Sequence, residues 1–432
     1  MEMERNEYIQ KLIQKKDNGR VKIITGIRRC GKSYLLFELY TKYLRENGVR
    51  EDQIIGLALD ELANAKYRNP FALDAYIRER IVDNTKRYYI LIDEIQFVSE
   101  VPNPYIEDAT AKITFIDVVL GFMQMKNADV YVTGSNAKFL SKDVITEFRG
   151  RGDEVKMYPL SFAEFMSEYK GSENLGLDEY MMYGGLPQIL SQKSEEQKIS
   201  YLKNLFAETY IKDIKERYKI RHEEELEELL NIISSSIGSL TNPAKLVNTF
   251  KSIKNVTIAP DTIKSYLDYL CDSFLVEKVM RYDVKGKKYI DTPYKYYFTD
   301  MGLRNARINF RQDEKPHLME NLIFNELLIR GFNVDVGVVP IVYIGEDKKQ
   351  HRTQLEIDFV CNQGSKRYYI QSAFRMENEE KRKQEQASLL KVNDSFKKII
   401  ITGEECLVHR NEHGFTTMSI YDFLLNPNSL DM

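Results

Sequence analysis

The sequence contains no tryptophan and only four cysteines among its 432 residues. These cysteines are Cys30, Cys271, Cys361 and Cys406, and no two of them form a CxxC pair. Such wide spacing indicates neither a zinc site nor a disulfide framework. Cysteines without partners fit a reducing compartment, so we expect a cytoplasmic protein.

A strong charge imbalance and long apolar runs are also missing. The formal net charge is -3, so there is no global basic field of the kind that attracts nucleic acid, although a local basic patch stays open. No apolar run approaches the roughly 18 residues that a membrane helix needs. The first segment, "MEMERNEYIQKLIQKK", is charged and lacks the apolar region of a signal peptide. We therefore expect an intracellular protein with no membrane partner.

The sequence does carry enough apolar residues, 43%, to build a sizeable core, and its length suggests several domains. Its first part alternates strand-like and helix-like segments. "VKIITG" (21–26) precedes a helix that ends at Asn47-Gly48, and "QIIGLALD", "YYILIDE" and "DVYVTGS" are three more apolar runs. This alternation predicts an α/β fold with a parallel sheet and crossover helices.

"GIRRCGKS" fits the pattern G-x-x-x-x-G-K-[ST] between a predicted strand and a predicted helix, where phosphate-binding loops occur. Its backbone N–H groups and the helix N-terminus favour a phosphate. Lys32 can reach the β- and γ-phosphates, and the Ser33 hydroxyl can bind Mg²⁺. The predicted nucleotide-binding residues are Gly26, Ile27, Arg28, Arg29, Cys30, Gly31, Lys32, Ser33 and Tyr34.

Two carboxylates end the apolar run "YYILIDE". We expect Asp93 to hold Mg²⁺ and Glu94 to polarise the attacking water. Paired acids at this position favour hydrolysis over phosphoryl transfer to a small molecule.

Two further segments supply candidates for the γ-phosphate. "VYVTGSN" ends in polar residues, of which Ser135 or Asn136 can face the phosphate or the water; Asn136 is the catalytic candidate. In "FRGRG", an arginine can stabilise transition-state charge, in cis or from a neighbouring subunit. Arg151 is the candidate and Arg149 the alternative, and a surface salt bridge to Asp153 or Glu154 is the competing interpretation.

After about residue 158 the pattern becomes helical. Residues 242–253 and 259–273 predict two helices, and 274–291 predict a hairpin, which is the order of a winged helix. DNA binding would place Thr262, Lys264 and Ser265 of the second helix in a major groove, with Lys285, Lys287 and Lys288 on the wing. The nearby acidic run "HEEELEEL" argues against a nucleic-acid surface.

These motifs, with "YPLSFAEF", "YGGLP", "YYFTDMGLRNA", "EIDFV" and "YIQSAF", follow the order seen in one prokaryotic family. The chain resembles, over nearly its whole length, AAA-like (archaeal-ATPase-type) ATP-binding proteins with a C-terminal domain similar to restriction endonucleases. The resemblance implies ATP and Mg²⁺ at Lys32, Ser33 and Asp93, Glu94 as catalytic carboxylate, and a winged helix between Asn242 and Phe298. It implies a P-loop ATPase domain (1–158), a helical lid with winged helix (159–310) and a restriction-endonuclease-like domain (311–432).

The C-terminal segment 356–374 has the outline of a metal-dependent nuclease hairpin, but part of the usual set is replaced. Glu320 on a helix and Asp358 on a strand can form a vestigial acid site. Gln371 stands where a second acid belongs, and Ala373 where the lysine belongs. A lysine can reach in from the following helix, such as Lys381 or Lys383, so an active nuclease, a degenerate nuclease fold and an unrelated hairpin all stay open.

The predicted function is Mg²⁺-dependent ATP binding and hydrolysis by Lys32, Glu94, Asn136 and Arg151, driving a conformational switch. Double-stranded DNA, a second copy of the chain or a protein partner are the candidate partners. The alternatives are an ATP-regulated nuclease and an ATP-gated interaction protein without a nucleic-acid role.

Overall fold

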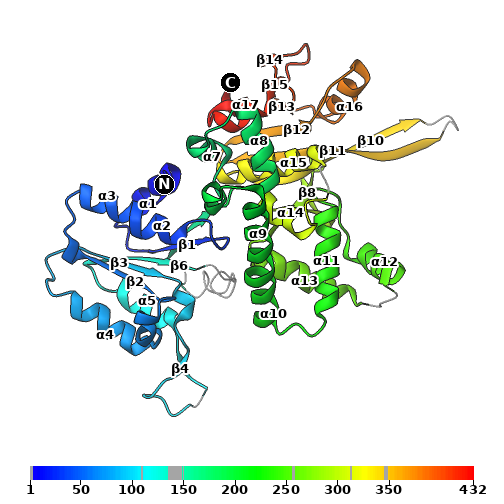
Figure 1. Ribbon diagram of the computed structural model, residues 1–432. Coiled ribbons are helices and arrows are strands. Elements are labelled where there is room, and N and C mark those ends of the chain that lie inside the picture. The colour runs from blue at the N-terminus through cyan, green and yellow to red at the C-terminus, as the bar shows by residue number, and fades with distance from the viewer. Residues whose placement is uncertain are drawn as a thin grey trace. The chain divides into compact units, whose positions relative to one another are not determined.

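The computed structural model describes residues 3–108, 110–134, 148, 150–254, 258–311, 314–344 and 349–432. Within these ranges the chain forms two compact units (Figure 1). Unit 1 comprises Met1–Pro159 with Asp272–Phe274, and unit 2 comprises Leu160–Cys271 with Leu275–Met432.

In the part of the chain that the structure describes, unit 1 is built around a five-stranded parallel sheet of order β2-β3-β6-β1-β7. The strands are β1 (Val21–Gly26), β2 (Ile54–Ala58), β3 (Tyr88–Asp93), β6 (Ala128–Thr133) and β7 (Gly152–Met157). The predicted parallel α/β sheet is confirmed, and β7 is a strand that we did not predict. Because all the strands run the same way, their carboxyl ends meet at one edge of the sheet.

Helices cover both faces of this sheet (Figure 1). On one face, α4 (Pro70–Arg80) and α5 (Phe115–Met123) bury apolar side chains against the strands. Asn69 and Thr114 begin these helices because their side chains accept backbone N–H groups of the first turn. The other face is covered by α1 (Asn6–Lys15) and by a continuous helical run formed by α2 (Lys32–Tyr34), the π-helix η1 (Leu35–Tyr40) and α3 (Thr41–Glu46). A small hairpin of β4 (Val101–Pro102) and β5 (Lys112–Ile113) completes the unit.

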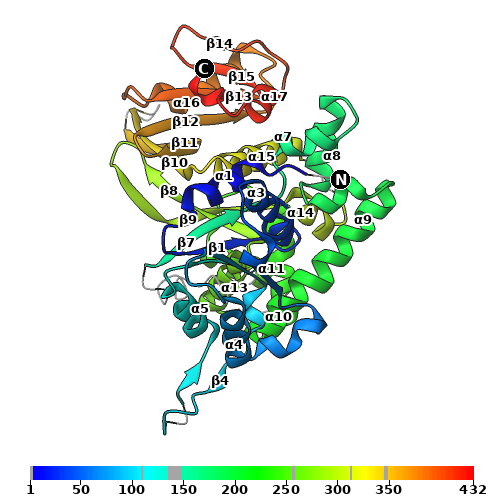
Figure 2. The same ribbon diagram turned by 90° about the vertical axis from the view of Figure 1, so that its left-hand side faces the viewer.

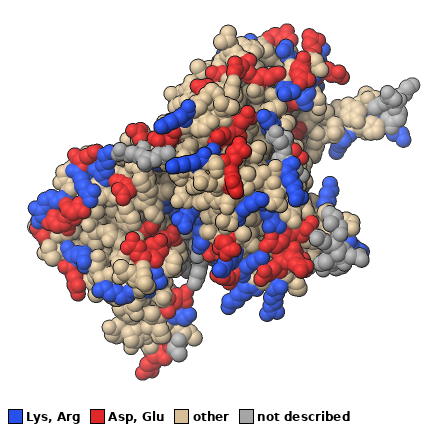
Figure 3. Space-filling view, viewed as in Figure 1, with Lys and Arg blue, Asp and Glu red and all other residues tan. Residues whose placement is uncertain are grey.

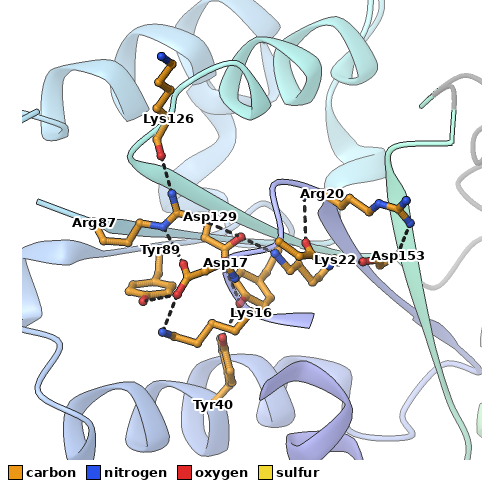
Figure 4. Close-up of polar contacts among 12 residues, drawn as sticks. Lys16, Asp17, Arg20, Lys22, Tyr40, Arg87, Tyr89, Lys126, Asp129 and Asp153 are labelled. Carbon is orange, nitrogen blue, oxygen red and sulfur yellow. Dashed lines mark hydrogen bonds and ion pairs between the residues drawn. The ribbon is translucent and has the colours of Figure 1, made fainter. Parts of the chain in front are cut away.

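A buried ion pair joins β1 to β6 near the amino ends of the strands (Figure 4). The Lys22 ammonium pairs with the Asp129 carboxylate, and both side chains are almost fully enclosed. Asp129 also accepts hydrogen bonds from the Asp17 backbone N–H at 2.9 Å and from the Tyr131 hydroxyl at 2.7 Å. Arg87 Nε lies 2.7 Å from the Asp17 carboxylate. Burial lowers the pKa of Lys22 and Asp129 opposes that shift, so the two charges depend on each other.

Replacing one partner of this pair should be costly. We expect Lys22→Met to destabilise unit 1 by about 3 kcal/mol, because it leaves the buried Asp129 carboxylate without its ammonium. The double variant Lys22→Met/Asp129→Asn should recover most of that loss, since it buries no charge. Hydrogen exchange of β1 and β6 peptides measures the local stability, and the exposed pair Arg78–Asp74 offers a control in which Arg78→Met has little effect. Equal exchange in Lys22→Met and wild type would remove the ion pair from the account of stability.

Unit 2 begins with helices, as expected after residue 158. They are α7 (Phe162–Glu168), α8 (Glu173–Tyr183), α9 (Glu195–Asn204), the π-helix η7 (Leu205–Ile211), α10 (Lys212–Tyr218), α11 (Glu223–Ser235), α12 (Pro243–Lys254), α13 (Pro260–Asp272) and α14 (Met301–Arg307). The predicted order of two helices and a hairpin is confirmed by α12, α13 and the antiparallel strands β8 (Val276–Asp283) and β9 (Lys288–Phe298).

The segments "YGGLP" and "FTDMGLRNA" pack tightly together in this unit. The Asp300 carboxylate begins α14 by accepting the Leu303 backbone N–H at 3.0 Å, and it also accepts the Gly185 N–H at 2.8 Å. A Cβ at Gly302 would lie 2.0 Å from the Tyr183 carbonyl oxygen, so only glycine fits there. These contacts give the two motifs a structural role.

The raised pKa of Asp300 leads us to predict that the stability of unit 2 depends on pH. Burial raises its pKa from the usual 3.8 to about 6, against the lowering effect of its backbone N–H partners. A raised carboxyl pKa contributes stability below pH 4 that is lost as the pH rises to about 6, up to about 3 kcal/mol for two pKa units. Asp300→Asn keeps one acceptor oxygen and cannot ionise, so its unfolding free energy should change less between pH 4 and 6. Denaturant unfolding at both pH values tests this. An equal change of unfolding free energy between pH 4 and 6 in variant and wild type would contradict it.

An eight-stranded mixed sheet forms the rest of unit 2 among the described residues, in the order β14-β15-β13-β12-β11-β10-β8-β9 (Figure 2). Its further strands are β10 (Asn333–Ile344), β11 (Gln350–Gln363), β12 (Lys366–Ala373), β13 (Lys397–Thr402), β14 (His409–Arg410) and β15 (Thr416–Ser419), and its helices are α15 (Lys315–Ile329), α16 (Glu379–Leu390) and α17 (Ile420–Leu425). The β8–β9 hairpin joins this sheet because β8 pairs in parallel with β10, for example Arg281 with Val336. The sheet is therefore continuous across residue 310, where we predicted a domain boundary.

Candidate nucleotide-binding site

The segment between β1 and α2 lies at the carboxyl edge of the unit 1 sheet and has the backbone that its glycines predict. Gly26 has φ 138° and its Cβ would lie 2.0 Å from the Met157 carbonyl oxygen, so β1 can approach β7 only with glycine there. Gly31 has φ 101° and is the residue from which α2 begins. The positive φ at both positions, which favours glycine, turns the chain between β1 and α2.

Lys32 lies inside this turn. Its side chain is buried, and its ammonium donates to the carbonyl oxygens of Gly26 and Ile27, both at 3.1 Å. The loop thus closes around the cation expected to meet a phosphate. Of the other predicted binding residues, Ile27 and Cys30 are buried, Gly31, Arg28 and Tyr34 are half-buried, and Arg29 and Ser33 are exposed.

The two predicted acids lie at the carboxyl end of β3, at the same edge of the sheet. Asp93 is the last residue of β3 and is buried, and Glu94 follows it with a left-handed backbone at φ 51°. Burial raises the pKa of Asp93, and hydrogen bonding by the Ser33 and Thr133 hydroxyls lowers it. The structure therefore brings Ser33 of the loop and Asp93 of β3 together, as the motif predicted.

Thr133, the last residue of β6, links the two acids. Its hydroxyl donates to the Asp93 carboxylate and accepts the Glu94 backbone N–H at 3.0 Å. The Glu94 carboxylate in turn accepts a hydrogen bond from Gln96. We predicted no role for Thr133, although a hydroxyl at the end of a buried strand was a usable signal.

This set of donors fits a Mg²⁺-bound nucleoside triphosphate. The loop backbone and the Lys32 ammonium lie at this edge, as do the Ser33 hydroxyl and the buried Asp93 carboxylate, and no bulky side chain replaces a glycine of the loop. Ammonium and N–H groups suit phosphate oxygens, whereas hydroxyl and carboxylate oxygens suit Mg²⁺.

Arg151 does not join this group within one chain. It immediately precedes β7, and its carbonyl oxygen accepts the backbone N–H of Val21, the first residue of β1. Because β1 and β7 are parallel, Arg151 lies at the amino end of the sheet, whereas the loop follows the carboxyl end. The proposed cis role is therefore wrong; its exposed position leaves the role in trans as a prediction. Asp153 pairs with Arg20 at 3.1 Å.

The candidates Ser135, Asn136 and Arg149 lie outside the residues that the structure describes. Their proposed contact with the γ-phosphate stays a prediction.

The acids predicted in the C-terminal part, Glu320 on α15 and Asp358 on β11, belong to unit 2. Burial raises the pKa of Asp358 well above its usual range, and the charge of Glu320 raises it further, so the two acids lie close enough to interact. The lysine beside them is Lys295 of β9, whose ammonium is 2.9 Å from Glu320. Lys381 and Lys383, the lysines expected from the following helix, form ion pairs within α16, with Glu385 at 2.8 Å and with Glu379 at 3.7 Å.

The parallel sheet and the glycine loop between β1 and α2 together show that unit 1 has a P-loop NTPase fold. In agreement, residues 18–166 match the family model described as AAA domain, and residues 174–314 match a domain of unknown function (DUF8612). An uncharacterized protein of Haemophilus influenzae is 34% identical over 406 residues, which is 93% of each chain. The chain belongs to the same family as that protein.

Two more distant similarities extend the comparison. The uncharacterized protein MJ1544 of Methanocaldococcus jannaschii is 27% identical over 416 residues, covering 90% of this chain and 86% of that one. Among solved structures, the Walker-type ATPase PABY2304 of Pyrococcus abyssi is 14% identical with a TM-score of 0.49, covering 71% of this chain and 96% of that one. No helix in the described ranges is both long and apolar enough to cross a bilayer.

Thr133 gives a sharp test of the site. We expect Thr133→Val to lower ATP hydrolysis about 10- to 100-fold, because it removes the hydroxyl that orients Asp93 and satisfies the Glu94 N–H. Thr133→Ser keeps the hydroxyl and should stay near wild type. Phosphate release is measured for both, with thermal unfolding to show that each variant is folded. Equal rates in the valine and serine variants would exclude this role for the hydroxyl.

Proposed function

We propose that unit 1 binds ATP with Mg²⁺ and hydrolyses it, and that hydrolysis drives a conformational change in the chain. The AAA-domain match supports ATP binding and hydrolysis in general. The observation that carries the specific proposal is the Asp93–Thr133–Glu94 arrangement beside the Ser33 end of the loop. It presents two carboxylates, one buried and one half-buried, at the edge where the loop lies.

Each residue has a role that follows from its chemistry. Lys32 supplies the positive charge that offsets phosphate oxygens, and the N–H groups of the loop do the same at the start of α2. Ser33 and Asp93 would hold Mg²⁺, which when bound neutralises phosphate charge and orients the triphosphate. Glu94 accepts the proton of the attacking water, and its backbone is held in place by Thr133.

The wider role includes an expected action on DNA through α13 and the β8–β9 hairpin. Lys264 of α13 and Lys287 and Lys288 of the hairpin are exposed, which supports contact with phosphates. Lys285 is engaged within the unit, since its ammonium donates to the Pro340 carbonyl oxygen at 3.0 Å. Acidic and basic side chains are interspersed over the face seen in Figure 3. We therefore keep DNA as a candidate partner beside a protein partner or a second copy of the chain.

Two substitutions test the ATPase proposal. Glu94→Gln should reduce phosphate release about 10²- to 10⁴-fold while ATP still binds, because the amide cannot take the proton. Lys32→Ala should weaken ATP binding itself, measured with a fluorescent ATP analogue. Glu100→Gln is the matched control, since Glu100 lies outside the site and pairs with Lys112 at 3.0 Å. Wild-type hydrolysis in Glu94→Gln would remove Glu94 from the mechanism, and no hydrolysis in any form would replace the enzyme with a nucleotide-binding switch.

A further inference from the structure

An ionic cluster in unit 2 brings together side chains from three separate elements. Lys295 and Tyr297 come from β9, Glu320 from α15, and Glu356 and Asp358 from β11. Lys295 and Tyr297 are two residues apart on one strand, as are Glu356 and Asp358, so each pair shares a face.

The Lys295 ammonium lies at the centre of the cluster. It is 2.9 Å from a Glu320 carboxylate oxygen and 2.7 Å from one of Glu356. The Tyr297 hydroxyl donates to the same Glu320 oxygen at 2.6 Å. Asp358 accepts the Ser372 backbone N–H at 2.8 Å, and its charge also acts on Lys295.

The exposed fractions of the side chains show that the Lys295 ammonium serves the acids around it. The Lys295 side chain is 4% exposed, that of Glu320 is 13% exposed and that of Glu356 is 34% exposed. The Glu320 carboxylate is enclosed enough to need a cation, because an uncompensated buried charge is strongly unfavourable. Lys295 supplies that cation from within the chain, and it is almost inaccessible to a phosphate arriving from solvent.

We propose that the ammonium of Lys295 occupies the place among Glu320, Glu356 and Asp358 that a divalent metal would take in a nuclease. The ammonium then pairs with Glu320 and Glu356 from within the chain, so the site neither binds a divalent ion nor cleaves nucleic acid, and it ties β9 to α15 and β11. In agreement, the described residues contain no group of three His, Cys, Asp or Glu side chains placed to hold a metal ion. Gln371 also gives an acid a polar partner from within the chain: its amide donates to Glu385 of α16 at 3.3 Å.

Manganese binding to the full chain, without nucleotide, tests the proposal. Wild type and Asp358→Asn should bind the same number of Mn²⁺ ions, counted by electron paramagnetic resonance of the free ion. Lys295→Met should gain one ion per chain, and the double variant Lys295→Met/Asp358→Asn should lose it again. Lys295→Met should also unfold about 5 °C or more below wild type, and Mn²⁺ should restore much of that loss in Lys295→Met alone.

Three results would overturn the proposal. The first is a Mn²⁺ ion bound by wild type and lost in Asp358→Asn. The second is plasmid cleavage by wild type with Mg²⁺ or Mn²⁺ that Asp358→Asn abolishes. The third is a folded Lys295→Met that gains no ion. If Lys295→Met does not fold, Lys295→Gln takes its place, and the comparison of wild type with Asp358→Asn decides by itself. These readouts are independent of ATP hydrolysis.

Discussion

The buried ion pair between Lys22 and Asp129 holds β1 beside β6, and the nucleotide site depends on that register. The same pairing of strands sets Ile24 opposite Thr133, so the residue that links Asp93 to Glu94 lies next to the end of β1, where the phosphate loop begins. Polar side chains gather at both ends of the sheet because its two faces are covered by helices. At the amino end the charged side chains of Lys22 and Asp129 pair with each other, whereas at the carboxyl end the loop offers groups that suit an anion.

Unit 2 uses a buried lysine in a similar way, with a different consequence. Lys22 pairs with a single carboxylate inside a sheet, whereas Lys295 pairs with two, one from helix α15 and one from strand β11. In both places the ammonium is almost completely enclosed, so its partners decide whether it stays charged. In our proposal, the Lys295 ammonium makes its acid partners part of the fold and not a metal site.

Local sequence patterns predicted the loop and the acidic strand end of unit 1 because each is a short contiguous segment. The glycines of the loop, Lys32 and the Asp93-Glu94 pair each follow a predicted strand, and parallel strands bring their carboxyl ends to one edge. The position predicted for Arg151 was wrong because Arg151 follows the β6 segment in the chain but precedes a strand, β7, that we did not predict. Thr133 was read as strand end rather than as a link between acids.

The spacing of neighbouring residues was enough to predict the phosphate loop, the acidic strand end and the helix-helix-hairpin order. It did not predict which lysine meets Glu320 and Glu356, which end of the sheet carries Arg151, or that the β8–β9 hairpin continues into the C-terminal sheet, because these depend on how the chain packs. Those outcomes depend on strand order or join residues far apart in the chain, such as Lys295 with Glu320 and Glu356, 25 and 61 positions away. No local periodicity encodes them, since they follow from which buried charges and sheet edges find partners as the chain packs.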